Sequence, residues 1–341
     1  MMRSLYSGVS GLKNHQTRMD VIGNNIANVN TVGFKTSRVV FQDIFSQTSK
    51  SGSRDLYVDL DPTIQRNIGG TNPVQIGLGV KLATVDVLHT QAPITRTDNP
   101  FDVFIQGDGM FIVQDINENY YYTRGGNFYL DDEGFLVTAH GYFVMGYTYD
   151  LKVVTYDFDP DNPELPDTPV PASVEVDKER GLLGATPDDD GVLPVLNKIR
   201  LRVPNDENDP TDPDAVSTVD NPFFVDLVGF SVGNNGDVNV VINNISQTIA
   251  YLGIAMFSNF GGLDKAGNSL YRESPSSGQA VIGMALENGS GSTVGGGLEM
   301  ANVDLANEFT DMIITQRGFQ ANSRVITVSD TLLEELINLK R

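Results

Sequence analysis

Three histidines are the residues of this chain most suited to holding a transition metal. His15, His89 and His140 are widely separated, and none belongs to an H-E-x-x-H motif or to a pair at i, i+4. There is no cysteine, which excludes disulfides, thiol catalysis and thiolate metal ligands. We therefore expect no zinc site and interpret the histidines as packing or surface residues.

An acidic segment contains the only motif that approaches a calcium loop. Asp157, Asp159 and Asp161 match its first three acidic positions, but Asn162 replaces the required glycine and Thr168 replaces the bidentate glutamate. A low-affinity cation site stays open, and a solvated acidic surface is the simpler interpretation. Carboxylate pairs for glycoside hydrolysis meet only in the folded chain, and nothing in the sequence selects one.

Nucleotide and nucleophile motifs are also missing from the sequence. No G-x-S-x-G elbow occurs, and the Gly77-Leu78-Gly79 and Gly107-Asp108-Gly109 pairs lack the third glycine of a dinucleotide loop. Both pairs are expected to form turns. The sequence therefore predicts no catalytic residue, no metal site, no cofactor and no enzyme activity.

Charge and hydropathy exclude further classes of protein. The net charge is −21, and residues 151–225 contribute −11 of it together with eleven of the sixteen prolines, whereas residues 1–50 carry +4. This balance argues against binding to nucleic acid or to anionic lipid. The longest apolar run, 249–257, is too short to span a bilayer, and the first twenty residues lack the apolar core of a cleavable signal peptide.

Both ends of the chain carry an apolar residue at every seventh position, with others between, and this pattern predicts long helices over 4–28 and 305–339. Asp304 is the expected N-cap of the second helix, with Glu308 in its first turn. The predicted polymerisation interface consists of Leu5, Val9, Leu12, Met19, Ile22 and Ile26 at the start and of Leu305, Phe309, Met312, Phe319, Ile326 and Leu333 at the end.

Two interpretations of these helices compete. Amphipathic helices commonly lie on the core of their own monomer. The strict sevenfold spacing instead favours helices that pair with each other or with neighbouring copies. A secreted β-domain glycosidase and a carbohydrate-binding adhesin are alternative functions, and either would stay active after both ends were trimmed.

The central part of the chain has the pattern of short antiparallel strands. Strands are expected at 80–87, 101–105, 111–114, 120–123 and 135–137, with a hairpin turn at 234–237 and one buried strand over 249–257. The Ser, Gly, Asn and Pro content of 46–79 gives no regular structure there.

These elements predict a mainly β fold of antiparallel barrel-like or sandwich-like domains, with terminal α-helices forming a coiled-coil-like assembly domain. The expected division is a helical domain from 1–32 and 303–341, a connector over 33–79, a β core from 80–147 and 225–288, an acidic Pro-rich outer β domain over 148–224, and a linker over 289–302.

Several motifs lie at the two ends of the chain and in its central part. At the N-terminus these are residues 7–12, 19–28 and 31–35, the last reading Thr-Val-Gly-Phe-Lys. At the C-terminus they are Leu298-Glu299, 302–305, Met312-Ile313, Gln316-Arg317, 319–322 and Asp330. In the central part they are 107–111, 122–128, the latter with Thr-Arg-Gly-Gly-Asn-Phe, and Gly262-Leu263. These motifs resemble those of bacterial flagellar rod and hook axial proteins, the central ones resembling the β core of that family. One departure is Ala301, where the family usually has serine.

The resemblance implies a structural subunit that polymerises through its terminal helices into a tube outside the cell. Because 151–225 reads as an added outer domain, the flagellar hook is the expected function, with the distal rod as the alternative. The implied partners are further copies of the chain, rod and hook–filament junction proteins, a hook cap during assembly and the flagellar type III export apparatus. Neither nucleic acid nor membrane insertion is expected.

Overall fold

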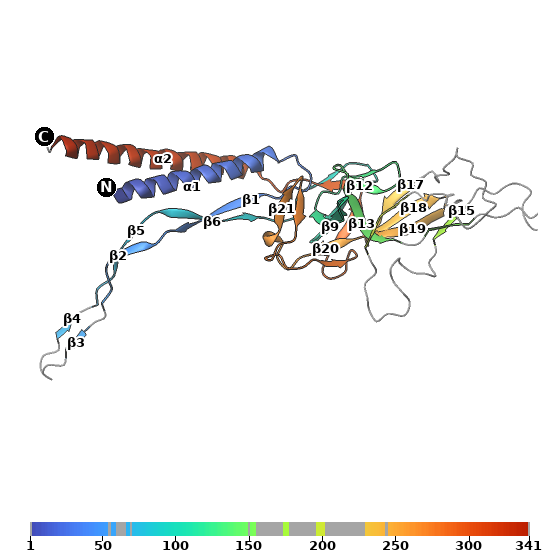
Figure 1. Ribbon diagram of the computed structural model, residues 1–341, viewed down its shortest axis with the longest axis horizontal. Helices are drawn as coiled ribbons and strands as arrows, with labels where there is room; N and C mark the ends of the chain where they lie inside the picture. The colour runs from blue at the N-terminus through green and yellow to red at the C-terminus, as the bar shows by residue number, and fades with distance from the viewer. Residues whose placement is uncertain are drawn as a thin grey trace, which may run out of the picture. The chain divides into compact units, whose positions relative to one another are not determined.

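A computed structural model describes residues 2–53, 56–58, 66–68, 70–148, 151–154, 173–176, 196–201, 229–242 and 245–339 (Figure 1). The chain forms two compact units. Unit 1 contains Met1–Val29, Thr36–Leu88 and Val303–Arg341, and unit 2 contains Asn30–Lys35 and His89–Asn302. Both ends of the chain thus belong to the same unit.

Two long helices dominate unit 1, as the sequence predicts. They are α1 (Met2–Ala27) and α2 (Leu305–Asn338). The carboxylate of Asp304 accepts hydrogen bonds from the backbone N–H groups of Ala306 at 2.9 Å and Asn307 at 3.3 Å. It therefore caps α2 as expected, and Glu308 lies in the first turn, where the helix dipole favours a negative charge.

A β ribbon completes unit 1. Its nested antiparallel pairs are β1 (Ser37–Asp43) with β6 (Val80–Val87), β2 (Ser46–Lys50) with β5 (Val74–Gly77), and β3 (Leu56–Val58) with β4 (Arg66–Ile68). The absence of regular structure predicted for 46–79 is wrong for these strands. Because every side chain of β2 and β5 is exposed, these strands have no buried face and so no apolar alternation to read.

Unit 2 is built around an antiparallel sheet of thirteen described strands. Along its main path the order is β17-β18-β19-β13-β9-β10-β22-β21, with five further strands paired at the side. The strands are β9 (Met110–Gln114), β10 (Tyr120–Thr123), β11 (Phe128–Leu130), β12 (Leu136–Thr138), β13 (Phe143–Thr148), β16 (Asn197–Lys198), β17 (Gly229–Val232), β18 (Asp237–Ile242), β19 (Ile245–Leu252), β20 (Ile254–Met256), β21 (Asp264–Gly267), β22 (Leu270–Arg272) and β23 (Val281–Gly283).

Three two-stranded pairs and a 3₁₀ turn, η1 (Phe260–Gly262), complete unit 2. The pairs are β7 (Ile94–Arg96) with β25 (Gly297–Glu299), β8 (Val103–Gln106) with β24 (Ser292–Gly295), and β14 (Leu151–Val154) with β15 (Ser173–Val176). The tract expected to be a linker therefore contains two strands. Its glycines serve close packing, since a Cβ atom added at Gly291 would lie 2.3 Å from the carbonyl oxygen of Gln106.

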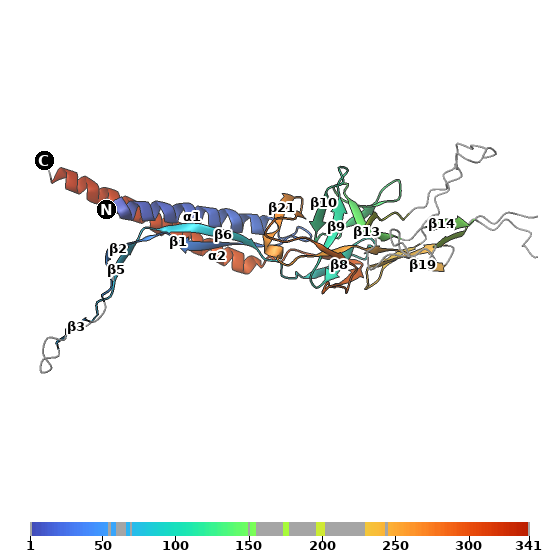
Figure 2. The ribbon, with the colours of Figure 1, turned by 60° about the horizontal axis from the view of Figure 1, so that its bottom comes forward.

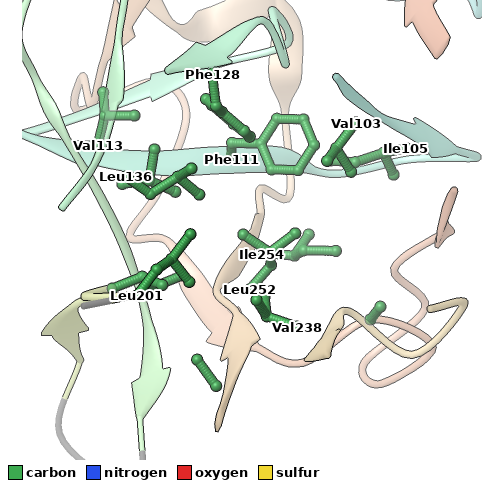
Figure 3. Packing of buried hydrophobic residues seen from close by; sticks show 14 of the residues in the cluster. Val103, Ile105, Phe111, Val113, Phe128, Leu136, Leu201, Val238, Leu252 and Ile254 are labelled. Atoms are coloured by element: carbon green, nitrogen blue, oxygen red, sulfur yellow. The ribbon is translucent and has the colours of Figure 1, made fainter. Parts of the chain in front are cut away.

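The core of unit 2 lies on both faces of β9, all of whose residues are buried. Phe111 and Val113 join one apolar cluster, whereas Met110 and Ile112 join another on the opposite face. Figure 3 shows Phe111 and Phe128 side by side in the first cluster, where their rings meet edge to face at 5.2 Å. The central strand is thus covered on both sides.

Several predicted strands are confirmed. Residues 80–87 and 120–123 coincide with β6 and β10, and the turn at 234–237 joins β17 to β18, with Phe230 opposite Val240. The single strand predicted over 249–257 is wrong, because Gly253 separates β19, which pairs with β13, from β20, which pairs with β9.

Part of the predicted outer domain belongs to the core. Ile199 and Leu201 are buried in the first apolar cluster, and β16 pairs with β13. Asp157, Asp159 and Asp161 lie outside the described residues, as does most of 148–224. The outer domain therefore stays a prediction.

Candidate assembly interface

The two terminal helices pack against each other in antiparallel orientation (Figures 1 and 2). At one end the hydroxyl oxygens of Ser4 and Ser329 lie 3.4 Å apart, and at the other the side-chain amide of Asn25 donates to Glu308 at 3.2 Å. Between them Arg18 forms an ion pair with Asp311 at 2.9 Å. The chain ends therefore pair along nearly the whole of α1.

Small residues line this helix seam. A Cβ atom added at Gly8 would lie 3.2 Å from Ile326, one at Gly11 would lie 2.5 Å from Asn322, and one at Gly318 would lie 2.7 Å from the ring of His15. Glycine at these positions lets the two backbones approach closely. Larger side chains there would push the helices apart.

Buried hydroxyl groups fill much of the remaining seam. Thr315 and Ser329 are buried, and each donates to a carbonyl oxygen of its own helix, Asp311 at 2.7 Å and Val325 at 2.8 Å respectively. These bonds satisfy the hydroxyls within their own helix. The seam is therefore more polar than a leucine-rich coiled coil.

Two asparagines attach α1 to the ribbon. The side chain of Asn14 donates to the carbonyl of Val80 at 2.8 Å. Asn25 exchanges two hydrogen bonds with the backbone of Ser37, at 2.9 and 3.1 Å. These bonds fix the rotation of α1 and so determine which of its faces stays open.

Burial perturbs two titratable groups at the seam. Burial raises the pKa of Glu308, and the nearby carboxylates of Asp311 and Asp304 act in the same direction against the hydrogen bond from Asn25. Burial and the charge of Arg18 lower the pKa of His15. Burial in the paired state thus disfavours the charged forms of both side chains.

The predicted interface residues mostly lie beside this seam, because many of them directly follow a seam residue in the sequence, as Val9 follows Gly8 and Phe319 follows Gly318. Only Ile22 is fully buried, and Ile326 contacts Gly8. Val9, Leu305 and Phe309 are exposed, and the remaining predicted residues, Leu5, Leu12, Met19, Ile26, Met312, Phe319 and Leu333, are half-buried. The apolar stripes flank the helix pair, and their role as a polymerisation interface stays a prediction.

Further apolar side chains of α2 are exposed. They are Ile313, Ile314, Val325, Val328, Leu332, Leu336 and Ile337, and Leu339 at the C-cap is exposed as well. Because Ser329 lies beside Ser4, the last part of α2 continues about two turns past the start of α1. An apolar surface of this kind on a helix indicates a site of contact with another chain.

The seam residues themselves were not predicted from the sequence. A usable signal exists, because Ser4, Gly8, Gly11 and His15 follow the three-and-four spacing of a helix face, as Thr315, Gly318 and Asn322 do on the other helix. The large apolar residues lie on the face beside the seam, so a prediction from apolar spacing selects that face.

The histidines occupy unrelated places. His15 contacts the seam, His89 packs against the rings of Phe260 at 5.7 Å and Tyr271 at 5.5 Å, and His140 lines a shallow cleft of unit 2. Within the described ranges, no three His, Asp or Glu side chains gather closely enough to hold a metal. Neither described helix has an apolar stretch long enough to cross a membrane.

Terminal helices that pair beside an elongated ribbon, joined to an antiparallel β unit, define a structural subunit with an unpartnered apolar helix face. Sequence comparison identifies the family. Matches cover residues 5–35 with "Flagella basal body rod protein", 104–240 with "Flagellar hook protein FlgE/F/G D1 domain" and 294–339 with "Flagellar basal body rod FlgEFG protein C-terminal".

Relatives match over their whole length. The flagellar basal-body rod protein FlgG of Bacillus subtilis is 40% identical over 343 residues, covering 100% of both chains. The flagellar hook proteins FlgE of Borreliella burgdorferi and Treponema pallidum are 35% identical over 452 residues and 32% over 473, again with 100% of both chains covered. The chain belongs to the flagellar rod and hook FlgE/F/G family, whose members are axial structural proteins of the flagellum and not enzymes.

Proposed function

We propose that the chain is a subunit of the flagellar rod. The observation that carries this proposal is length: the alignment with the Bacillus subtilis rod protein spans 343 positions, close to the 341 residues of this chain. The alignments with the two hook proteins span 452 and 473 positions, so those proteins carry more than a hundred residues without a counterpart here. The hook expected from 151–225 is therefore less well supported than the rod.

The rod would form by addition of copies of this chain, with the apolar stripes as the contact between subunits. Exposed side chains such as Val9 at 53%, Phe309 at 49% and Ile313 at 58% support this proposal, because a lone subunit leaves them in water. Neighbouring helices would cover them and contribute roughly 1 kcal/mol for each half-exposed side chain.

The remaining partners follow from a position in the axial structure. The subunit would leave the cell through the flagellar export apparatus, join other rod proteins below and support the hook above. These assignments rest on the family alone. The hook stays the alternative, because identity to the hook proteins also extends over the full chain.

Deletion of the gene in its own host tests the choice between rod and hook. A rod subunit predicts isolated basal bodies with truncated rods and no hook in electron micrographs, and a plasmid copy should restore both. Complete rods that merely lack hooks would assign the chain to the hook. Normal flagella in the deletion strain would overturn both assignments.

A further inference from the structure

Three motifs that are far apart in the sequence meet in one buried ionic cluster of unit 2. We call it the Glu299 cluster; it consists of Lys35, Arg124 and Glu299. The ammonium of Lys35 lies 2.8 Å from one carboxylate oxygen of Glu299, and Nε of Arg124 donates to the other oxygen. The three side chains are only 2%, 5% and 1% exposed.

Backbone groups satisfy the remaining hydrogen-bonding atoms. Lys35 also donates to the carbonyl oxygen of Thr90 at 2.7 Å, and the N–H of Ala92 donates to Glu299 at 2.9 Å. The guanidinium of Arg124 donates to the carbonyl oxygens of Ile105, Gly107 and Gly109. A buried ion group is tolerated only with such complete pairing.

The Gly107-Asp108-Gly109 turn therefore has a specific role. Both glycines have positive φ, +118° and +131°, a conformation that side chains other than glycine rarely adopt. The turn presents two carbonyl oxygens to Arg124. The sequence predicts the turn but not its contact with Arg124.

Backbone hydrogen bonds join the chain segments that carry Lys35 and Glu299. The N–H of Gly33 donates to the carbonyl of Glu299 at 2.8 Å, and that of Asn302 donates to Phe34 at 3.4 Å. A Cβ atom added at Gly33 would lie 2.6 Å from the backbone nitrogen of Gly125, so glycine permits the close approach of segment 30–35 to the segment that carries Arg124. Segment 30–35, which follows α1 in the chain, thus lies beside segment 297–302, which precedes α2.

The charge balance depends on Glu299. Burial alone would raise the pKa of its carboxyl, but the charges of Arg124 and Lys35 and the hydrogen bonds from Lys35 and Ala92 hold that pKa below its usual value. The carboxylate is therefore ionised. Without it, two buried cations would face each other, with only the nearby carboxylate of Asp108 acting as a counter-charge on Lys35.

We propose that Lys35, Arg124 and Glu299 are positioning residues that hold together the two segments leading into the assembly helices. The cluster closes only when the N-terminal, central and C-terminal parts of the chain have come together. Segments 30–35 and 297–302, through which the chain enters and leaves unit 2, are thereby held next to each other. This proposal applies equally to a rod and to a hook subunit.

The rival interpretation is a buried ion group that contributes only general stability to the β core. The two interpretations differ in which backbone amides become less protected when the cluster is disrupted. A positioning role predicts local opening of 30–35 and 297–302, whereas a general role predicts loosening of the whole sheet. Amide hydrogen exchange of the monomeric full-length chain separates them.

The key variant is Glu299→Gln, which keeps the shape and removes the charge. We expect exchange at Gly33 and Asn302 to accelerate more than about tenfold, with the amides of β9 unchanged. Asp98→Asn is the matched control, because it removes a carboxylate from an exposed ion pair with Arg96 in the same unit and should have no such effect.

A second variant tests whether the uncompensated positive charge causes the opening. Lys35→Met leaves a neutral Arg124–Glu299 pair and should be milder than Glu299→Gln, and the double variant should exchange more slowly at Gly33 than Glu299→Gln alone. Unchanged exchange at Gly33 and Asn302 in Glu299→Gln would overturn the proposal. Loss of exchange protection throughout the β sheet would overturn it as well. So would a double variant whose exchange at Gly33 is accelerated by the combined effect of the two single variants. Because the measurement uses monomer, its failure does not depend on the rod assignment.

Discussion

The glycines of the helix seam allow a quantitative test of how α1 and α2 pair. Gly318→Ala places a Cβ atom 2.7 Å from the ring of His15, which is itself close to the ring of Phe41. Overpacking of this kind costs about 1–3 kcal/mol. Alanine in place of glycine within a helix gains about 1 kcal/mol from propensity, which partly offsets the loss.

Gly23→Ala is the matched control, because a Cβ atom added at Gly23 in α1 would have no neighbouring atom within 4 Å. Both substitutions gain the same helix propensity, so their difference isolates the steric cost. We expect Gly318→Ala to be less stable than Gly23→Ala by about 1–3 kcal/mol. Gly11→Ala should fall between them, because the side chain of Asn322 that it meets can turn away.

The assay is urea unfolding of the monomeric chain followed by the helical circular dichroism signal. His15→Ala combined with Gly318→Ala should recover part of the lost stability, since the clashing ring is gone. Equal midpoints for Gly318→Ala and Gly23→Ala would show that the helices do not approach each other at Gly318. The antiparallel seam described above would then be wrong.

Three further predictions concern assembly, pH and capping. Phe309→Asp should prevent the formation of sedimentable polymers while leaving the monomer fold intact. Gln316→Asp changes an exposed polar residue on the same helix and should still allow polymers to form; equal polymerisation of both variants would count against the apolar interface. Burial lowers the pKa of His89 from 6.5 to about 4, so the neutral side chain contributes roughly 3 kcal/mol to the stability of unit 2 above pH 6.5, and this contribution is lost as the pH falls toward 4. His89→Gln should therefore make the melting temperature less dependent on pH between 6.5 and 4, and an unchanged pH profile would contradict this prediction. Asp304→Ala should reduce the stability of α2 by about 1 kcal/mol in urea unfolding, and no loss would argue against the cap.

Local signals explain why the helices and many strands could be predicted from the sequence. The limits of α2 follow from Asp304 and a long apolar period, and those of β6 and β10 follow from short β-branched or aromatic runs between turns. Each of these signals lies within a few residues. Elements whose pattern is carried by their own side chains are therefore readable.

Elements defined by distant partners could not be predicted. Strand β24 has a Gly- and Ser-rich sequence typical of a linker, yet it pairs with β8 from the other end of unit 2. The Glu299 cluster likewise joins residues 35, 124 and 299, and nothing local to any of them indicates the other two. Only the tertiary structure reveals such pairings.

The contrast between the seam and its flanks links the fold to assembly. Glycines, polar pairs and the contact between the Ser4 and Ser329 hydroxyls hold α1 to α2, and such contacts bury little apolar surface. Many large apolar side chains of α2, among them Phe309, Ile313 and Leu336, are exposed instead. Helices in proteins gain most of their stability from the packing of an apolar face. A subunit that keeps that face for its neighbours therefore has a less stable helix pair alone than in the assembly, and we expect neighbouring copies to stabilise it.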